Sequence, residues 1–244
     1  MVGGDAAADA VARAPRLPEL RVGLHLNLVD GHPVLPDVEI PRLVCGKGEF
    51  DRNMARAGVR FCMFPGVRRQ LASEIRAQFA AFHATGLPLD HVNAHKHMHL
   101  HPCVAKLIIE IGRDYGMKAV RVPSEPVAVL RRAFPGERYR TPLYRPWVDA
   151  LRRRLRRAGL RTNDHLFGLA WSGGMVEERI LGLIPYLPDG VSEIYLHPAA
   201  ECAPSIAPAL RGYRRDEELA ALLSPLLRNR IADAGIRLVS YSDL

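Results

Sequence analysis

The sequence predicts an α/β fold in which a parallel sheet is wrapped by helices. Helical and strand patterns alternate along the chain, and the strands are short and rich in apolar residues. Polar residues recur at or near the strand ends, mostly the carboxyl ends, where (β/α) barrels place their active sites. Together these observations favour a TIM-like (β/α) barrel.

The order of elements follows from apolar spacing and from glycine and proline stops. The expected helices cover residues 5–14 with Asp5 as cap, 67–85, a segment that Pro102 opens and Gly116 ends, 146–158, 175–187 and 216–234. The six expected strands are 20–28, the stretch that begins at 87, 118–122, 165–169, 192–196 and 237–241. Residues 31–65 hold four prolines and predict a long loop insertion, a common form of functional lid.

Length and composition suit one large domain over residues 1–244. No apolar run approaches 18 residues and no signal peptide is evident, so we expect a cytoplasmic protein. The four cysteines, Cys45, Cys62, Cys103 and Cys202, include no Cys-x-x-Cys pair. They are interpreted as reduced thiols or core fillers, not as a disulfide frame or zinc knuckle.

Residues 87–102 contain five of the ten histidines, at every second position. In an extended strand this spacing places one set of side chains on a single face: His91, Asn93, His95, His97, His99 and His101. Neutral imidazole is a common metal ligand, so the face predicts a metal site. The alternative is a surface tract that loads stray metal.

Other strands end in polar residues as well, namely His25, Arg121, Asp164 or His165, and His197. Taken singly, His25 or His197 could be a hydrogen-bonded core histidine. Several strands that deliver such residues to one rim favour a functional site.

The net charge of +8 is concentrated in residues 131–161, which hold eleven arginines, no lysine and two acids. No nucleic-acid motif accompanies them, so we expect no nucleic-acid partner. Residues 151–161 form a basic stretch with Leu151 and Leu155 as an apolar stripe. It is either a solvated helix face or a peripheral contact with an anionic membrane, which would be the inner face.

Three segments resemble signature blocks of the YdjC-like carbohydrate deacetylases: Gly-Leu-His-Leu-Asn-Leu at 23–28, Asn-Ala-His-Lys-His-Met-His at 93–99, and Glu-Ile-Tyr-Leu-His-Pro-Ala at 193–199. Val-Arg-Val-Pro-Ser-Glu-Pro at 120–126 is most similar to the hopanoid-biosynthesis-associated branch. The resemblance implies a TIM-like barrel that hydrolyses the N-acetyl group of an amino sugar. In that branch the substrate would be an acetylglucosaminyl hopanoid.

The resemblance also implies roles for single residues. His25 and His95 would bind one divalent ion, magnesium by resemblance, although zinc, cobalt or nickel would also suit. His197 would be the acid for the leaving amine. The residues expected to bind substrate are Asn27, Asn93, His97, His99, Arg121, Glu125 and Asp164.

Two departures from the family pattern bear on activity. Asn93 stands where the family has an aspartate, and the family's initial Asp-Asp-Phe-Gly block is not found. We therefore expect a barrel that is N-terminally incomplete, without its first strand, first helix and most of its second strand. The alternatives are an inactive metal-binding barrel, a truncated copy, or another barrel-type metal-dependent amidohydrolase. A homodimer stays open.

Overall fold

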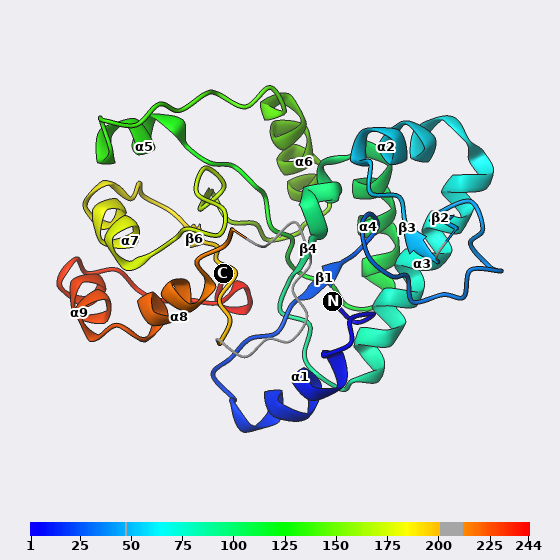
Figure 1. Cartoon of the computed structure of the whole chain (residues 1–244), viewed down its shortest axis with the longest axis horizontal. Coiled ribbons are helices and arrows are strands. Elements are labelled where there is room, and N and C mark those ends of the chain that lie inside the picture. The colour runs from blue at the N-terminus through cyan, green and yellow to red at the C-terminus, as the bar shows by residue number, and fades with distance from the viewer. Residues whose placement is uncertain (47, 201–211) are drawn as a thin grey trace. The chain divides into compact units, whose positions relative to one another are not determined.

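The computed structural model describes residues 1–46, 48–200 and 212–244 and shows a mixed α/β fold (Figure 1). The expected α/β class is thus confirmed. The chain groups into two compact units: unit 1 comprises Met1–Arg121, Pro146–Thr162 and Ser240–Leu244, and unit 2 comprises Val122–Arg145 and Asn163–Val239. In the part of the chain that is described, the strands form three two-stranded sheets, without a closed barrel. One domain over 1–244 stays a prediction.

Unit 1 is built on a short parallel sheet. β1 (Leu24–Leu26) pairs with β4 (Val92–Ala94) in a register that places His25 beside Asn93. Two single parallel bridges extend this sheet: Val92 pairs with Val120, and Ala119 pairs with Arg161. The remaining elements of unit 1 are α1 (Ala7–Arg13), η1 (Ala14–Arg16), β2 (Val44–Cys45), β3 (Glu49–Phe50), α2 (Met54–Met63), α3 (Pro65–Ala84), η2 (His95–Leu100), α4 (Pro102–Asp114), η5 (Tyr241–Asp243) and, apart from its first residue, α6 (Arg145–Arg157).

Residues 31–65, predicted to be a long loop because of their prolines, contain regular secondary structure. β2 and β3 form an antiparallel hairpin, and α2 follows it with the Asn53 side chain as N-cap. The buried Glu74 of α3 accepts hydrogen bonds from the backbone N–H groups of Val34 (2.9 Å) and Leu35 (3.0 Å). These bonds fasten the start of the insertion to the longest helix of the unit.

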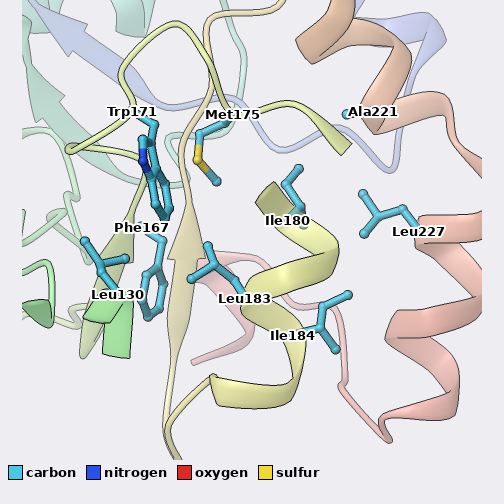
Figure 2. Packing of buried hydrophobic residues seen from close by; sticks show 9 residues of the cluster. All are labelled: Leu130, Phe167, Trp171, Met175, Ile180, Leu183, Ile184, Ala221 and Leu227. Atoms are coloured by element: carbon cyan, nitrogen blue, oxygen red, sulfur yellow. The ribbon is translucent and has the colours of Figure 1, made fainter. Parts of the chain in front are cut away.

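Unit 2 has its own parallel pair and its own apolar core. β5 (His165–Phe167) pairs with β6 (Ser192–Ile194). Figure 2 shows Phe167 flanked by Leu130 and Leu183 in the core cluster. Among its described residues, this unit has the helices α5 (Val127–Ala133), α7 (Glu177–Leu183), η3 (Ile184–Tyr186), α8 (Arg215–Leu223) and α9 (Pro225–Asp233).

The strands are shorter than the apolar patterns predict. Residues 20–23 are not part of β1, and no strand forms at 237–241. Leu20 and Leu238 are 58% and 76% exposed. Because these side chains do not pack against the core, they do not stabilise a strand at either segment. The chain end instead folds into η5, which Ser240 and Asp243 close as a capping box.

Several helix predictions also need correction. Asp5 does not cap α1, which begins after Ala6 without a side-chain cap. The predicted helix 216–234 is two helices, because Pro225 has no N–H and keeps Ser224 extended, and the Ser224 hydroxyl then caps α9. The helix predicted at 175–187 narrows to α7 and continues as η3 at Pro185. The sequence pattern missed α5.

Candidate metal-binding and catalytic site

The histidine segment turns sharply at the end of β4. The strand stops at Ala94, and residues 95–100 form η2 with Lys96 (φ 49°) and His97 (φ 55°) in the left-handed region. The predicted extended strand through 101 is therefore wrong, and its histidines do not share one face. Left-handed conformations cost non-glycine residues about 1–2 kcal/mol each. Here the salt bridge from Lys96 Nζ to Asp30 Oδ2 (2.7 Å) and the burial of Met98 help to hold the turn.

The turn brings His95 next to His25. The centres of the two rings lie 5.8 Å apart with an angle of 74° between the ring planes. An ion bound to a nitrogen of each ring at about 2.1 Å would hold the ring centres about 5–6 Å apart. The pair therefore fits one shared metal ion.

The tautomer of His25 is set by a chain of side-chain hydrogen bonds. His91 Nδ1 donates to Asp90 Oδ2 (2.9 Å), and Asn93 Nδ2 donates to His91 Nε2 (3.3 Å). Asn93 Oδ1 in turn accepts from His25 Nδ1. Burial lowers the pKa of His25 to about 3, so the ring is neutral and its Nε2 carries a lone pair. Such a ring is ready to bind a metal.

Residues 241 and 242 hold the Asp90 end of this series of hydrogen bonds. Asp90 Oδ1 accepts from the backbone N (3.0 Å) and the hydroxyl (2.6 Å) of Ser242, and the His91 ring stacks on Tyr241 at 4.5 Å. The sequence analysis missed Asp90 and did not separate His91 from the other histidines. The available signal was a carboxylate directly before the first histidine of the segment.

Four more predicted site residues lie in unit 1. Burial lowers the pKa of His99, and the neighbouring His97 and Arg121 lower it further, so these groups lie near one another. The rings of His97 and His99 are 5.9 Å apart. Asn27 is buried, and its Oδ1 has no hydrogen-bond partner among the described residues. Buried polar atoms usually have a hydrogen-bond partner, so this oxygen is an exception.

The predicted substrate residues of unit 2 hold loops in place. The Glu125 carboxylate accepts from the backbone N–H groups of residues 168, 169 and 170, each at 2.9 Å. Burial nevertheless raises the pKa of Glu125. Asp164 Oδ2 accepts from the backbone N–H of Val191 (3.0 Å). A role for either residue in substrate binding stays a prediction.

His197 lies between two tyrosine rings of unit 2. Its ring centre is 4.9 Å from that of Tyr195 and 5.0 Å from that of Tyr213. Its backbone N–H donates to Glu218 Oε2 (2.6 Å), and Glu218 Oε1 accepts from the backbone N–H of Met175 (2.9 Å). The fully buried Glu218 therefore positions the residue that the resemblance makes the acid.

The cysteines are not all scattered. Cys62 Sγ lies 3.0 Å from Cys103 Sγ and 3.5 Å from His101 Nε2. Cys62 and Cys45 are exposed, so core filling is the wrong interpretation for both. Cys202 lies outside the described residues. The sequence analysis missed this grouping because Cys62 lies about forty residues before His101 and Cys103 in the sequence.

Comparison with known proteins identifies the class. The family model described as YdjC-like protein matches residues 1–233. A carbohydrate deacetylase of Geobacillus stearothermophilus is 30% identical over 98% of this chain and 82% of its own length. The carbohydrate deacetylases of Brevibacillus brevis and Homo sapiens are 26% and 27% identical over 100% and 98% of this chain, and 86% and 79% of their own lengths.

A solved structure shares the fold. The crystal structure of a proposed cellobiose-phosphate cleavage protein from Enterococcus faecalis V583 superposes with a TM-score of 0.71 and 22% identity, covering 100% of this chain and 85% of its own. The chain belongs to the YdjC-like family. The prediction of an enzyme of the carbohydrate deacetylase class is confirmed by these relatives. In the described residues, no helix combines the length and apolarity needed to cross a membrane.

Proposed function

We propose that the protein is a metal-dependent hydrolase that removes the N-acetyl group from an amino sugar. The observation that carries the proposal is the pair of His25 and His95, with ring centres 5.8 Å apart and with the Nδ1 of His25 bonded to Asn93. Two imidazoles held in this way suit one divalent ion. The curated relatives, named carbohydrate deacetylases, support the reaction class.

The residues fit the metal that the resemblance implies. His25 and His95 would hold the ion, which is magnesium by resemblance, or zinc, cobalt or nickel by imidazole preference. Bound there, a divalent ion polarises an amide carbonyl and lowers the pKa of water.

The protein's own side chains would position the sugar and move protons. By resemblance, Asn27, His97, His99 and Arg121 would form the sugar-binding surface of unit 1; of these, Arg121 is partly exposed. Lys96 holds the pKa of Asp30 below its usual value, and the charge of His95 adds to this effect. Asp30 is therefore ionised at neutral pH and is our candidate base. His197 is our candidate acid for the leaving amine, by resemblance.

For the substrate we propose an acetylglucosaminyl hopanoid. The support is the similarity of residues 120–126 to the hopanoid-associated branch. Within this segment Val120 and Val122 are buried, whereas Arg121 is partly exposed. Arg121 is therefore exposed enough to reach a ligand.

A hopanoid substrate would require contact with a membrane, which we propose for α6. The predicted apolar stripe does not serve this purpose, because Leu151 and Leu155 are buried in the core. What faces outward are arginines together with Leu143, Tyr144 and Trp147, which are exposed at the start of the helix. Aromatic and basic side chains together are typical of peripheral contact with an anionic bilayer.

The barrel and the oligomeric state are also proposals. The parallel strands of unit 1, with polar residues at their carboxyl ends, are typical of an arc of a TIM-like barrel. A crystal structure would test the barrel. Light scattering would test the homodimer.

The experiment that tests the activity is acetate release from N,N′-diacetylchitobiose and from an acetylglucosaminyl hopanoid. We expect release that a chelator abolishes and that added divalent metal restores. His25→Ala and His95→Ala should lose activity together with the metal ion that this pair would hold, whereas the exposed His83→Ala should keep both. Metal binding without acetate release would instead favour an inactive metal-binding protein. Release from neither sugar but from another amide would favour a different amidohydrolase.

A further inference from the structure

A second group of metal-ligand side chains lies in unit 1, built from different residues. Cys62, His101 and Cys103 each offer one ligand atom, and these atoms all lie within 4.8 Å of one another. We call these three residues the thiol–imidazole cluster. None of them belongs to the candidate site formed around His25 and His95.

The cluster is assembled by two helix ends. Cys62 is the second-last residue of α2, and Cys103 lies in the first turn of α4 after Pro102 at its first position. His101 is the extended N-cap residue of α4, and its ring packs edge-on against Phe61 of α2 at 5.9 Å. The packing of α2 on α4 therefore creates the cluster and holds the imidazole against the sulfurs.

The hydrogen bond with Cys103 and burial raise the pKa of the Cys62 thiol, but positive groups near both sulfurs favour the thiolates that a metal would bind. The N-terminus of a helix carries partial positive charge, and Cys103 lies within the first turn of a 13-residue helix. The Arg68 guanidinium donates to the backbone O of Cys62 (2.7 Å) and brings a positive charge to the second cysteine. Two thiolates beside these groups would neutralise the charge of one divalent ion.

We propose that Cys62, His101 and Cys103 form a second metal site that takes zinc. Zinc accepts two thiolates and one imidazole with bond lengths of about 2.3 Å and 2.1 Å, which places sulfur and nitrogen about 3.6 Å apart and the two sulfurs about 3.8 Å apart. The distance from Cys62 Sγ to His101 Nε2 is 3.5 Å and already fits. The sulfurs, at 3.0 Å, must separate by about 0.8 Å, which rotation of the exposed Cys62 side chain allows.

A metal accounts for the cluster better than a disulfide between the two cysteines does. A disulfide would use the two sulfurs and leave the imidazole without a role. His101 Nε2 instead lies at ligand distance from Cys62 Sγ. Because the cluster is partly exposed, water can complete a four-coordinate site. Zinc bound here would clip α2, and with it the insertion at 31–65, to the start of α4.

The test uses cobalt as a spectroscopic probe of the whole chain, reduced with a phosphine and stripped with a chelator. We expect thiolate-to-cobalt charge-transfer absorption that rises to a plateau on titration with Co²⁺ and that excess Zn²⁺ abolishes. A site made only of histidines, such as His25 with His95, gives no such band. The result therefore does not depend on the proposed deacetylase activity.

Single substitutions assign the ligands. Cys62→Ser and Cys103→Ser should each lose the band, and His101→Ala should weaken zinc binding at least 10-fold. Cys45→Ser, at another exposed cysteine, should change nothing. Far-ultraviolet circular dichroism checks that each variant folds. Where a serine variant does not fold, the alanine variant of the same cysteine replaces it. The proposal is overturned if the wild type shows no thiolate band, or if the band survives in both Cys62→Ser and Cys103→Ser.

Discussion

His25 Nδ1 donates a hydrogen bond to Asn93 Oδ1, and the two residues are register partners in the parallel pair of β1 and β4. The backbone pairing thus sets the position of the imidazole, and the amide sets its tautomer. Outer partners of this kind tune metal ligands in proteins. Asn93 supplies the same acceptor geometry as the family's aspartate without its charge.

Asn93→Ala should weaken metal binding about 10- to 100-fold, because the His25 ring loses the partner that fixes its tautomer and orientation. Isothermal titration with Zn²⁺ or Co²⁺, in a Cys62→Ser background, measures the effect. Asn53→Ala is the matched control: its side chain caps α2, so its loss should cost about 1 kcal/mol of stability and leave the metal affinity unchanged. An equal loss of affinity in both variants would show that Asn93 acts only through stability.

Gly23→Ala should disturb the series of hydrogen bonds that links Asp90 to His25. A Cβ at this position would lie 2.6 Å from His91 Cε1 and 2.8 Å from the His91 carbonyl oxygen, so backbone as well as side chain must move. We expect a loss of about 1–3 kcal/mol in the free energy of unfolding, measured with urea, together with weaker metal binding. Gly46→Ala is the control, since its Cβ would meet nothing within 4 Å. Similar stability of both variants would contradict the prediction.

Glu218→Ala should destabilise unit 2. The substitution leaves the buried N–H groups of Met175 and His197 without their acceptor, at about 1–3 kcal/mol each. Its neighbour Glu217 is the control: it forms an exposed ion pair with Arg214, so Glu217→Ala should leave stability nearly unchanged. If His197 is the acid, Glu218→Gln should retain more stability than activity. Urea unfolding and acetate release, measured on the same samples, decide between a purely structural role and a positioning role.

Asp51 should make stability depend on acid pH. The hydrogen bond from Arg56 holds the pKa of Asp51 below its ordinary value of 3.8, and the backbone N–H of Asn53 acts in the same direction. A carboxyl group whose pKa is lower in the folded state stabilises that state above the ordinary pKa. This contribution is lost as pH falls through the folded pKa. The wild type should therefore exceed Asp51→Asn in free energy of unfolding at pH 7, and the gap should narrow below about pH 4. A gap that stays constant with pH would refute this.

The sequence by itself determined the α/β class and most helices, and it singled out His25 and His95 as the proposed metal pair. Apolar spacing located α3 and α4, and glycine and proline located several of their ends, because these are local properties of the chain. The motif around His25 and the one around His95 indicated one site before any distance was known. The glycine of the first motif has a physical reason in the contact with His91.

Only the tertiary structure decided what happens after Ala94. Alternation predicted one long face of histidines, but Lys96 and His97 adopt left-handed conformations in a turn that includes the Lys96 ion pair with Asp30, 66 residues away in sequence. Cys62 and Cys103 meet for a similar reason, because α2 packs on α4. Side-chain alternation is set by adjacent backbone angles, whereas these turns and meetings depend on packing between distant segments. No local pattern in the sequence encodes them.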